Sequence, residues 1–281
     1  MVLKHDPIKE SVYTRDKNLV VFNQLGVKIE MDSVSNAEYY SWLDDMIVRI
    51  GSLVKGAEIV EKEAARQSPP LNTAIYYDSA DYRILPTGAL LRTSCNKITH
   101  AFCAFKAPED DNHVRRDHRF VFDGEEKRTI QQAPHSPEAV AIVRRMLART
   151  DVEHPGTHLE RTMGISPLDL FPAVCLDDYR YTFFAWLDGR DALRCSIDRY
   201  HVSDLRLPEE ERERRPLSEV ELAIYPRIEP DVARDPRVPE LIGTLADALC
   251  ERFGVGQTHE IKYQRSARTL GIAAGGSTSG S

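Results

Sequence analysis

The sequence has no long apolar run. None of its stretches reaches the roughly 18 consecutive apolar residues that a membrane-spanning helix needs, so we expect no membrane partner. Its first 18 residues, MVLKHDPIKESVYTRDKN, also lack the apolar core of a secretory signal peptide. These two absences favour a cytoplasmic protein.

The sequence also lacks a set of cysteines or histidines spaced as metal ligands. Its five cysteines are an odd number without metal-ligand spacing, so we expect buried thiols in a reducing compartment. Its nine histidines are scattered along the chain. The net charge of −7 argues against DNA as a partner. Carboxylates, arginines and lysines are left as the candidates for chemistry.

Three stretches have the period of an amphipathic helix. The first begins near Ser35, and its apolar stripe predicts a helix that continues to about Arg66, with Gly56 as a weak point. The second begins with the capping sequence Ser136-Pro137-Glu138. The third covers roughly residues 237–253 and ends at a glycine.

Short segments with alternating apolar and polar residues predict eight strands. They cover residues 24–32, 72–78, 88–95, 99–106, 114–122, 177–187, 191–198 and 216–225. Hairpin-like junctions are expected at Asn96-Lys97, Pro108–Asn112 and Asp188–Arg190. We therefore expect an α+β protein built on an eight-stranded antiparallel β-barrel, with the helices packed outside. We expect one domain over residues 1–272, followed by AAGGSTSGS, residues 273–281, as a flexible tail or a linker added in cloning.

The polar faces of these strands carry many charges. In GVKIEMDS, residues 26–33, one face is apolar and the other presents Lys28, Glu30 and Asp32. The same division recurs in VRRDHRFVF, DDYRYTFFAW, ALRCSIDRY and LSEVELAIY. An open sheet with one face in water would also alternate in this way. However, these faces have few Ser, Thr and Gln residues, and the three helices are available to cover the apolar faces.

If the helices pack outside, the charged faces line the interior of the barrel. Buried charges are costly unless they are paired or bind ions and ligands. Such an interior is best explained by a polyanion held by arginine and lysine, together with a divalent cation held by glutamate and aspartate.

Six stretches contain the motifs of interest. The most specific is AIYYDSADYRILPTGALLR, and the others are AFCAFKAP, VRRDHRF, SIDRY, LSEVELAI and EIKYQR. In these stretches and their order, the sequence resembles the triphosphate tunnel metalloenzymes, also called the CYTH superfamily, over roughly residues 24–265. The first stretch resembles the family segment YYDT-x-D…G-x-x-LR, and EIKYQR is similar to a family motif with a lysine near the C-terminus.

This resemblance implies an eight-stranded tunnel that holds a triphosphate-containing small molecule and one or two Mg²⁺ or Mn²⁺ ions. Carboxylates would bind the metal and position the attacking water, at Glu30, Asp198, Glu219 and Glu221. Basic side chains would hold the phosphates, at Arg92, Lys106, Arg115, Arg180, Arg194 and Lys262.

The first strand departs from the family signature E-x-E-x-K, because its register gives Lys28, Glu30 and Asp32. A lysine in place of the first glutamate should repel a divalent cation. Three hypotheses stay open: a metal-dependent triphosphatase, with nucleotide cyclisation as a variant of it; a binding module impaired in hydrolysis; and a protein whose interior charges only pair with one another. The sequence leaves the oligomeric state open.

Overall fold

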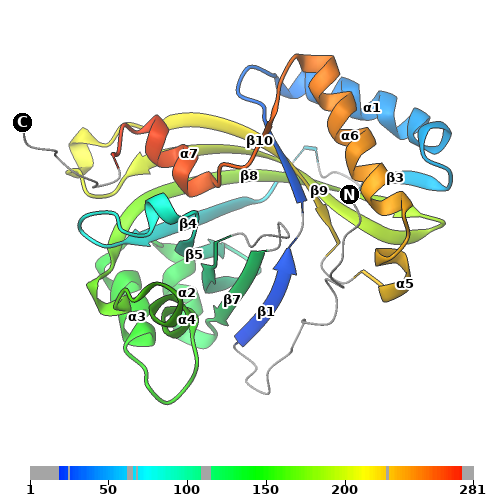
Figure 1. The fold of residues 1–281 in the computed structure, drawn as a ribbon. Coiled ribbons are helices and arrows are strands. Elements are labelled where there is room, and N and C mark those ends of the chain that lie inside the picture. The colour runs from blue at the N-terminus through cyan, green and yellow to red at the C-terminus, as the bar shows by residue number, and fades with distance from the viewer. Residues whose placement is uncertain are drawn as a thin grey trace, which may run out of the picture.

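The computed structural model describes residues 19–24, 26–61, 66–67, 69–108, 115–225 and 228–273, with only the backbone described at residues 19–24 and 115. These residues form a fold of helices and strands around one large antiparallel sheet, as expected of an α+β protein (Figure 1). Ten strands follow one another in the order β1-β7-β6-β5-β4-β8-β9-β10-β2-β11, and β3 pairs with β8 beside this path. The strands are β1 (Leu19–Gln24), β2 (Gly26–Glu30), β3 (Ala57–Glu61), β4 (Leu71–Asp78), β5 (Leu90–Asn96), β6 (Ala101–Lys106), β7 (Arg115–Val121), β8 (Phe171–Leu187), β9 (Arg190–Asp204), β10 (Arg215–Ile224) and β11 (Gln257–Thr258).

All eight predicted strands are present, but a closed eight-stranded barrel is not confirmed. Between the described strands, hydrogen bonding follows an open path that ends at β1 and β11. The additional strands β1, β3 and β11 are short, and each is formed by pairing with a strand distant in the sequence. Hairpins join β5 to β6 and β8 to β9 as predicted, whereas most of the junction expected at Pro108–Asn112 lies outside the described residues.

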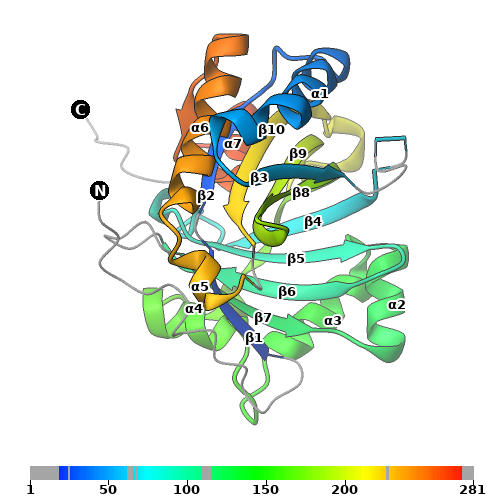
Figure 2. The same ribbon diagram turned by 90° about the vertical axis from the view of Figure 1, so that its right-hand side faces the viewer.

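The chain itself connects β1, at one end of the sheet, to β2, which is next to the last strand at the other end. β1 pairs with β7 and β2 pairs with β10, yet only residue 25, which is not among the described residues, separates β1 from β2. Figure 2 shows β2 and β1 one after the other along the side of the sheet. Because consecutive Cα atoms are 3.8 Å apart, the adjoining ends of these strands can be at most about 7.6 Å apart. The sheet must therefore curve strongly to bring β7 and β10 to the same run of chain.

Helix α1 (Asn36–Leu53) and helix α6 (Arg237–Phe253) cover one part of the outer face of the sheet (Figure 2). Ser35 caps α1 through a capping box with Glu38. The prediction that this helix continues to about Arg66 is wrong. Gly56 has a φ of +77°, and residues 57–61 form β3 instead. The predicted helix 237–253 and its terminating glycine are confirmed.

Helices α2 (Gly124–Gln132), α3 (Pro137–Leu147) and α4 (Pro155–Met163) cover the outer face of β5, β6 and β7. Ser136 caps α3 as predicted. Helix α5 (Pro230–Ala233) is a single turn before α6. In the part of the chain that the structure describes, no helix is long and apolar enough to cross a membrane.

Helix α7 (Lys262–Thr269) lies against the opposite face of the sheet from the other helices, which we call the inner face. Its Tyr263 stacks on Tyr76 of β4, with ring centroids 4.8 Å apart, and packs in a cluster with Val174, Tyr200 and Leu217. Since side chains alternate between the two faces of a strand, these residues share their face with the charged positions of the same strands. α7 therefore covers one end of the inner face.

Candidate functional site

A row of charged side chains crosses four neighbouring strands on the inner face. Arg180 of β8 lies opposite Asp198 of β9, and Asp198 lies opposite Glu219 of β10. Glu219 in turn lies opposite Glu30 of β2. The next inward positions along these strands are Thr182, Ser196, Glu221 and Lys28, which form a second row.

A second group of charges comes from β5, β6 and β7. Arg92 and Arg119 both lie opposite Ala104 of β6, one on each side of it. Lys106 lies opposite Asp117, with 3.6 Å between Lys106 Nζ and Asp117 Oδ2. Arg119 also pairs with Asp117, at 2.7 Å between Nη2 and Oδ2. The apolar residues between these positions belong to the core beneath α2, α3 and α4, so the charges are on the inner face.

The two groups face each other across the inner face. Four strands separate β6 from β10 in the sheet, yet the charges of Lys106 and Glu221 act on each other. Burial opposes ionisation of Glu221, but the positive charges of Lys28, Arg180, Lys106 and Lys262 outweigh it and hold its pKa at about 2. The curved sheet thus brings a lysine of one half close to a glutamate of the other.

Lys106 is surrounded by both basic and acidic side chains. Burial is the largest cause that lowers its pKa, and the neighbouring charges of Arg92 and Arg119 lower it further. Asp117 and Glu221 act in the other direction, and the pKa is about 7. Near neutral pH, therefore, Lys106 gains or loses its charge in response to small changes around it.

Two polar groups of this region are buried without a hydrogen-bond partner among the described residues. They are Nε of Arg92 and the hydroxyl of Tyr76, which lies opposite Arg92 on β4. A buried donor without a partner costs roughly 1–3 kcal/mol. Both groups are therefore candidates to contact a ligand.

A compact ion cluster forms where α7 meets the charged row. Arg180 binds Asp198 with two hydrogen bonds, of 2.7 Å from Nε and 2.8 Å from Nη2. Lys262 donates a short hydrogen bond to Asp198 Oδ2 and is 3.6 Å from both Asp178 Oδ2 and Glu219 Oε1. Burial raises the pKa of Asp178 to about 6, and the negative charge of Asp198 adds to this effect. The positive charges of Arg180 and Lys262 hold the pKa of Asp198 below its usual range, although burial opposes them.

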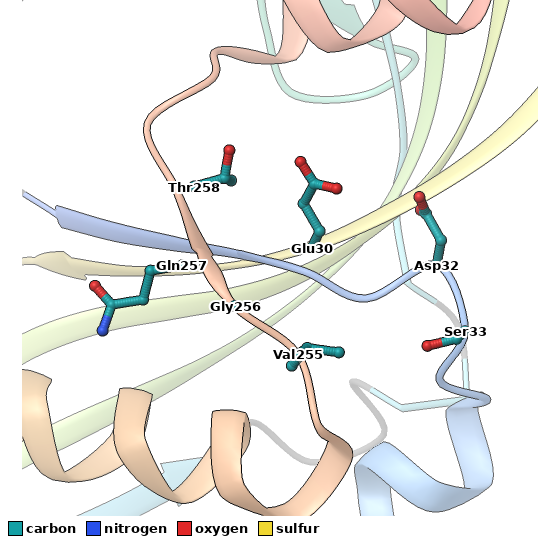
Figure 3. Close-up of a pocket in the computed structure, with 7 residues that line it drawn as sticks. All are labelled: Glu30, Asp32, Ser33, Val255, Gly256, Gln257 and Thr258. Atoms are coloured by element: carbon teal, nitrogen blue, oxygen red, sulfur yellow. The ribbon is translucent and has the colours of Figure 1, made fainter.

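Glu30 and Asp32 lie at the edge of this cluster and remain partly open to solvent. They line a pocket of about 430 Å³, together with the chain around β11 (Figure 3). Arg265 of α7 is 2.6 Å from Asp32 and 3.7 Å from Glu30, and Arg268 is 3.6 Å from Glu30. The acidic wall of this pocket is therefore partly neutralised by α7.

The structure places the predicted site residues as follows. Nine of the ten have described side chains, and all nine occupy the inner face or reach it from α7: Glu30, Arg92, Lys106, Arg180, Arg194, Asp198, Glu219, Glu221 and Lys262. Arg194 is open to solvent, and the side chain of Arg115 lies outside the described part of the chain.

The carboxylates predicted as metal ligands are engaged by basic side chains. Asp198 is held by Arg180 and Lys262, Glu219 lies near Lys262, and Glu30 lies near Arg265 and Arg268. Among the residues whose side chains are described, no three or more His, Cys, Asp or Glu are arranged to hold a metal ion. Mg²⁺ and Mn²⁺ take oxygen ligands of this kind, but here basic side chains lie at the same oxygens, so the arrangement does not fit either ion.

Sequence reasoning missed the roles of Arg119, Asp178 and Arg265. Arg119 and Asp178 lie at alternate positions that face inward on β7 and β8, so the alternating pattern of the sequence already indicated that they share a face with the predicted site residues. Arg265 is three residues after Lys262, a spacing that puts both on one side of a helix. The resemblance of EIKYQR to a family motif predicts a functional lysine but no helix, so the helical spacing of Lys262 and Arg265 is absent from the prediction.

No family model and no curated protein sequence matches the chain. Solved structures with a similar course of the chain do exist. One is a "putative adenylate cyclase" from Bacillus halodurans, 13% identical, with a TM-score of 0.47 over 86% of this chain and 97% of that chain. Another is a "putative adenylyl cyclase" from Hippeastrum with a dominant triphosphatase activity, 12% identical, with a TM-score of 0.48 over 88% and 96%. A protein from Pyrococcus horikoshii is 14% identical, with a TM-score of 0.40 over 85% and 95%.

The first two of these neighbours are described as a "putative adenylate cyclase" and as a "putative adenylyl cyclase" with a dominant triphosphatase activity. At these identities and TM-scores they say nothing about the chemistry of this chain. The function proposed below rests on the chain's own residues.

Proposed function

We propose that this protein binds a triphosphate-containing ligand on the inner face of its sheet. Inorganic triphosphate, polyphosphate and nucleoside triphosphates share the required chemistry. The observation that carries the proposal is the gathering of Arg92, Lys106 and Arg119 at neighbouring inward positions of β5, β6 and β7, where burial lowers the pKa of Lys106. Cations that repel one another on a concave face are stabilised by a bound polyanion.

The ligand is extended, because the cations are spread over several strands. Adjacent strands lie about 4.8 Å apart, so Arg92 on β5 and Arg119 on β7 are roughly 10 Å apart at the backbone. Arg180 and Arg194 approach from β8 and β9. A chain of linked phosphoryl groups would contact several of these side chains at once.

The proposal extends to the shape of the site. β1 and β2 together would act as one strand that joins β7 to β10, which gives the eight-stranded tunnel expected from the family resemblance. The phosphates would then lie inside this tunnel, on the side away from α7, because α7 and its ion cluster cover the other end.

Hydrolysis is a second candidate. It is favoured by Glu221, which the surrounding cations keep ionised and which therefore offers a carboxylate to position water beside the phosphates. Cyclisation of a nucleotide would differ only in using an internal ribose hydroxyl as the nucleophile. A binding module with slow or no turnover is the alternative that the paired carboxylates favour.

Calorimetry with tripolyphosphate tests the binding proposal. Arg92→Ala should weaken binding by about 1.5–3 kcal/mol, the range for hydrogen bonds to charged groups. Arg128→Ala is the matched control, because Arg128 is exposed on α2. Equal affinities of the natural protein and both variants would show that Arg92 does not hold the ligand.

A phosphate-release assay separates hydrolase from binder. Tripolyphosphate, ATP, GTP, thiamine triphosphate and polyphosphate would each be tested with Mg²⁺, with Mn²⁺ and with chelator. Release that disappears in Glu221→Gln while binding persists supports hydrolysis. Binding without release in every condition supports the binding module.

A further inference from the structure

The ammonium group of Lys262 lies among three carboxylates from three adjacent strands. Its Nζ is hydrogen-bonded to Asp198 of β9 and is 3.6 Å from Asp178 of β8 and from Glu219 of β10. The side chain of Lys262 is only 9% exposed, and those of the three acids are 7% exposed or less. The ammonium group of Lys262 therefore occupies the centre of a buried acidic cluster, which Arg180 and Arg265 contact from the sides.

Both carboxylate oxygens of Asp198 accept hydrogen bonds from basic side chains. Arg180 binds both of its carboxylate oxygens, and Lys262 binds Oδ2 as well. The other two acids are only partly satisfied. Asp178 Oδ1 and Glu219 Oε1 are buried and have no hydrogen-bond partner among the described residues. Both side chains are more than nine-tenths buried, so water does not solvate these two oxygens and a nearby cation is what stabilises their charge.

A cluster of this kind needs a cation. Removing carboxylates from water without a compensating charge is strongly unfavourable. In principle a divalent ion could supply the charge, since Mg²⁺ and Mn²⁺ prefer carboxylate oxygens. In this chain the charge comes from the protein, because α7 packs its Tyr263 against Tyr76 and so fixes Lys262, the preceding residue, over the acids.

We propose that Lys262 is a built-in cation that takes the place of a divalent metal ion between Asp178, Asp198 and Glu219. Two consequences follow. The natural protein does not bind a divalent ion at these acids. Binding of triphosphate, which rests on the function proposed above, does not require one.

Removal of the lysine should open the cluster to a metal. The experiment is a titration with Mn²⁺, followed by calorimetry and by the electron paramagnetic resonance of free Mn²⁺, without any phosphate ligand. We expect no saturable site in the natural protein and one Mn²⁺ per chain in Lys262→Ala. Lys55→Ala, which removes an exposed lysine before β3, is the matched control and should bind none. Adding Asp198→Asn to Lys262→Ala should abolish the gained site.

Each result of the Mn²⁺ titration decides the proposal. One Mn²⁺ bound by the natural protein and lost in Asp198→Asn would overturn it. Folded Lys262→Ala and Lys262→Met that both bind no Mn²⁺ would also overturn it. If neither variant folds, the titration of the natural protein decides alone.

The second consequence is tested with tripolyphosphate on the natural protein. Affinity in chelator within about twofold of that in Mg²⁺ is the expected result, and a loss of tenfold or more on chelation contradicts it. A protein that binds no tripolyphosphate under either condition refutes the proposed function and leaves the Mn²⁺ titration to decide the role of Lys262.

Discussion

Lys28 and Glu221 lie directly opposite each other on β2 and β10. Burial of Glu221 disfavours its charge, and Lys28 is the largest of the positive charges that overcome this and hold its pKa at about 2. Lys28, which departs from the family pattern, thus interacts with the carboxylate of Glu221. Glu30, which follows Lys28 on the same face, interacts with Arg265 and Arg268 instead.

This pair predicts a change in acid stability. Glu221 has a folded-state pKa below its unfolded value of about 4.3, so its stabilising contribution is present above that pH and is lost as pH falls toward 2. Lys28→Met should raise the folded-state pKa and shrink this loss. Denaturant unfolding at pH 6 and pH 3 measures it: the natural protein should lose more stability between the two than Lys28→Met. A loss as large in Lys28→Met as in Lys55→Met, an exposed-lysine control, would contradict the pairing.

Lys106 predicts a pH dependence of binding. Its pKa of about 7 means that it is charged below neutral pH and loses its charge above. A polyanion binds the charged form better, so tripolyphosphate affinity should fall as pH rises from about 7 to 9. Lys106→Arg stays charged over this range, so the fall should be smaller in this variant. Calorimetry at pH 6, 7, 8 and 9 makes the comparison. Identical pH profiles of affinity for the natural protein and Lys106→Arg would show that the charge of Lys106 does not contribute to binding.

The same shift has an opposite effect on the stability of the free protein. The folded-state pKa of Lys106 is lowered below its unfolded value of about 10.4, so between pH 7 and 10 the unfolded chain binds more protons. Lys106 therefore makes stability rise with pH in this window. Its replacement by methionine should flatten the pH dependence of the unfolding midpoint between pH 7 and 9, which chemical denaturation would detect.

Asp32 predicts a local effect on stability. It accepts a hydrogen bond of 2.6 Å from the Ser218 backbone N–H, and it lies 2.6 Å from Nη2 of Arg265, whose side chain is 1% exposed. Asp32→Ala leaves a buried guanidinium with one partner fewer and should cost about 1–3 kcal/mol. Asp45→Ala, which breaks an exposed pair with Arg49, should cost about 0.5 kcal/mol. Equal costs in denaturant unfolding would show that Arg265 does not depend on Asp32.

Replacing Gly56, in the turn after α1, should destabilise the folded protein. It has a φ of +77°, and a Cβ built on it would lie 2.2 Å from Asp188 Oδ1, on the turn between β8 and β9. Gly254 has a φ of +64° but open space around it. Gly254→Ala should cost about 1–2 kcal/mol for the backbone conformation alone, and Gly56→Ala should cost more. Thermal unfolding of the two variants isolates the contact with Asp188, and equal losses would exclude it.

Local sequence patterns were sufficient to predict the strands and part of the candidate site. Alternation identified which side chains of β2, β8, β9 and β10 share a face, because that depends only on the geometry of a strand. Which side chains contact one another across strands could not be predicted in this way. That Lys28 meets Glu221 depends on the pairing of β2 with β10, and this pairing is set by the whole fold.

The errors also have local causes. The stretch after Gly56, AEIVEKEAAR, contains good helix formers, but its first residues pair with β8, and this distant contact outweighs intrinsic propensity. The metal prediction came from the acids on the charged strand faces and from the family resemblance. It could not include the position of Lys262, which depends on α7 packing on the inner face.

The run formed by β1 and β2 has a consequence for how the chain reaches its native state. Glu30 pairs with Glu219, about 190 residues later, and β1 pairs with β7, about 100 residues later. During synthesis the ribosome releases this segment first, yet neither of its partners exists until much later. Contacts so distant in sequence are entropically costly and slow to form. We therefore expect the helix-covered hairpins to fold first and the N-terminal segment to add last, so that removal of β1 would speed the approach to a compact state while leaving β7 without its partner strand.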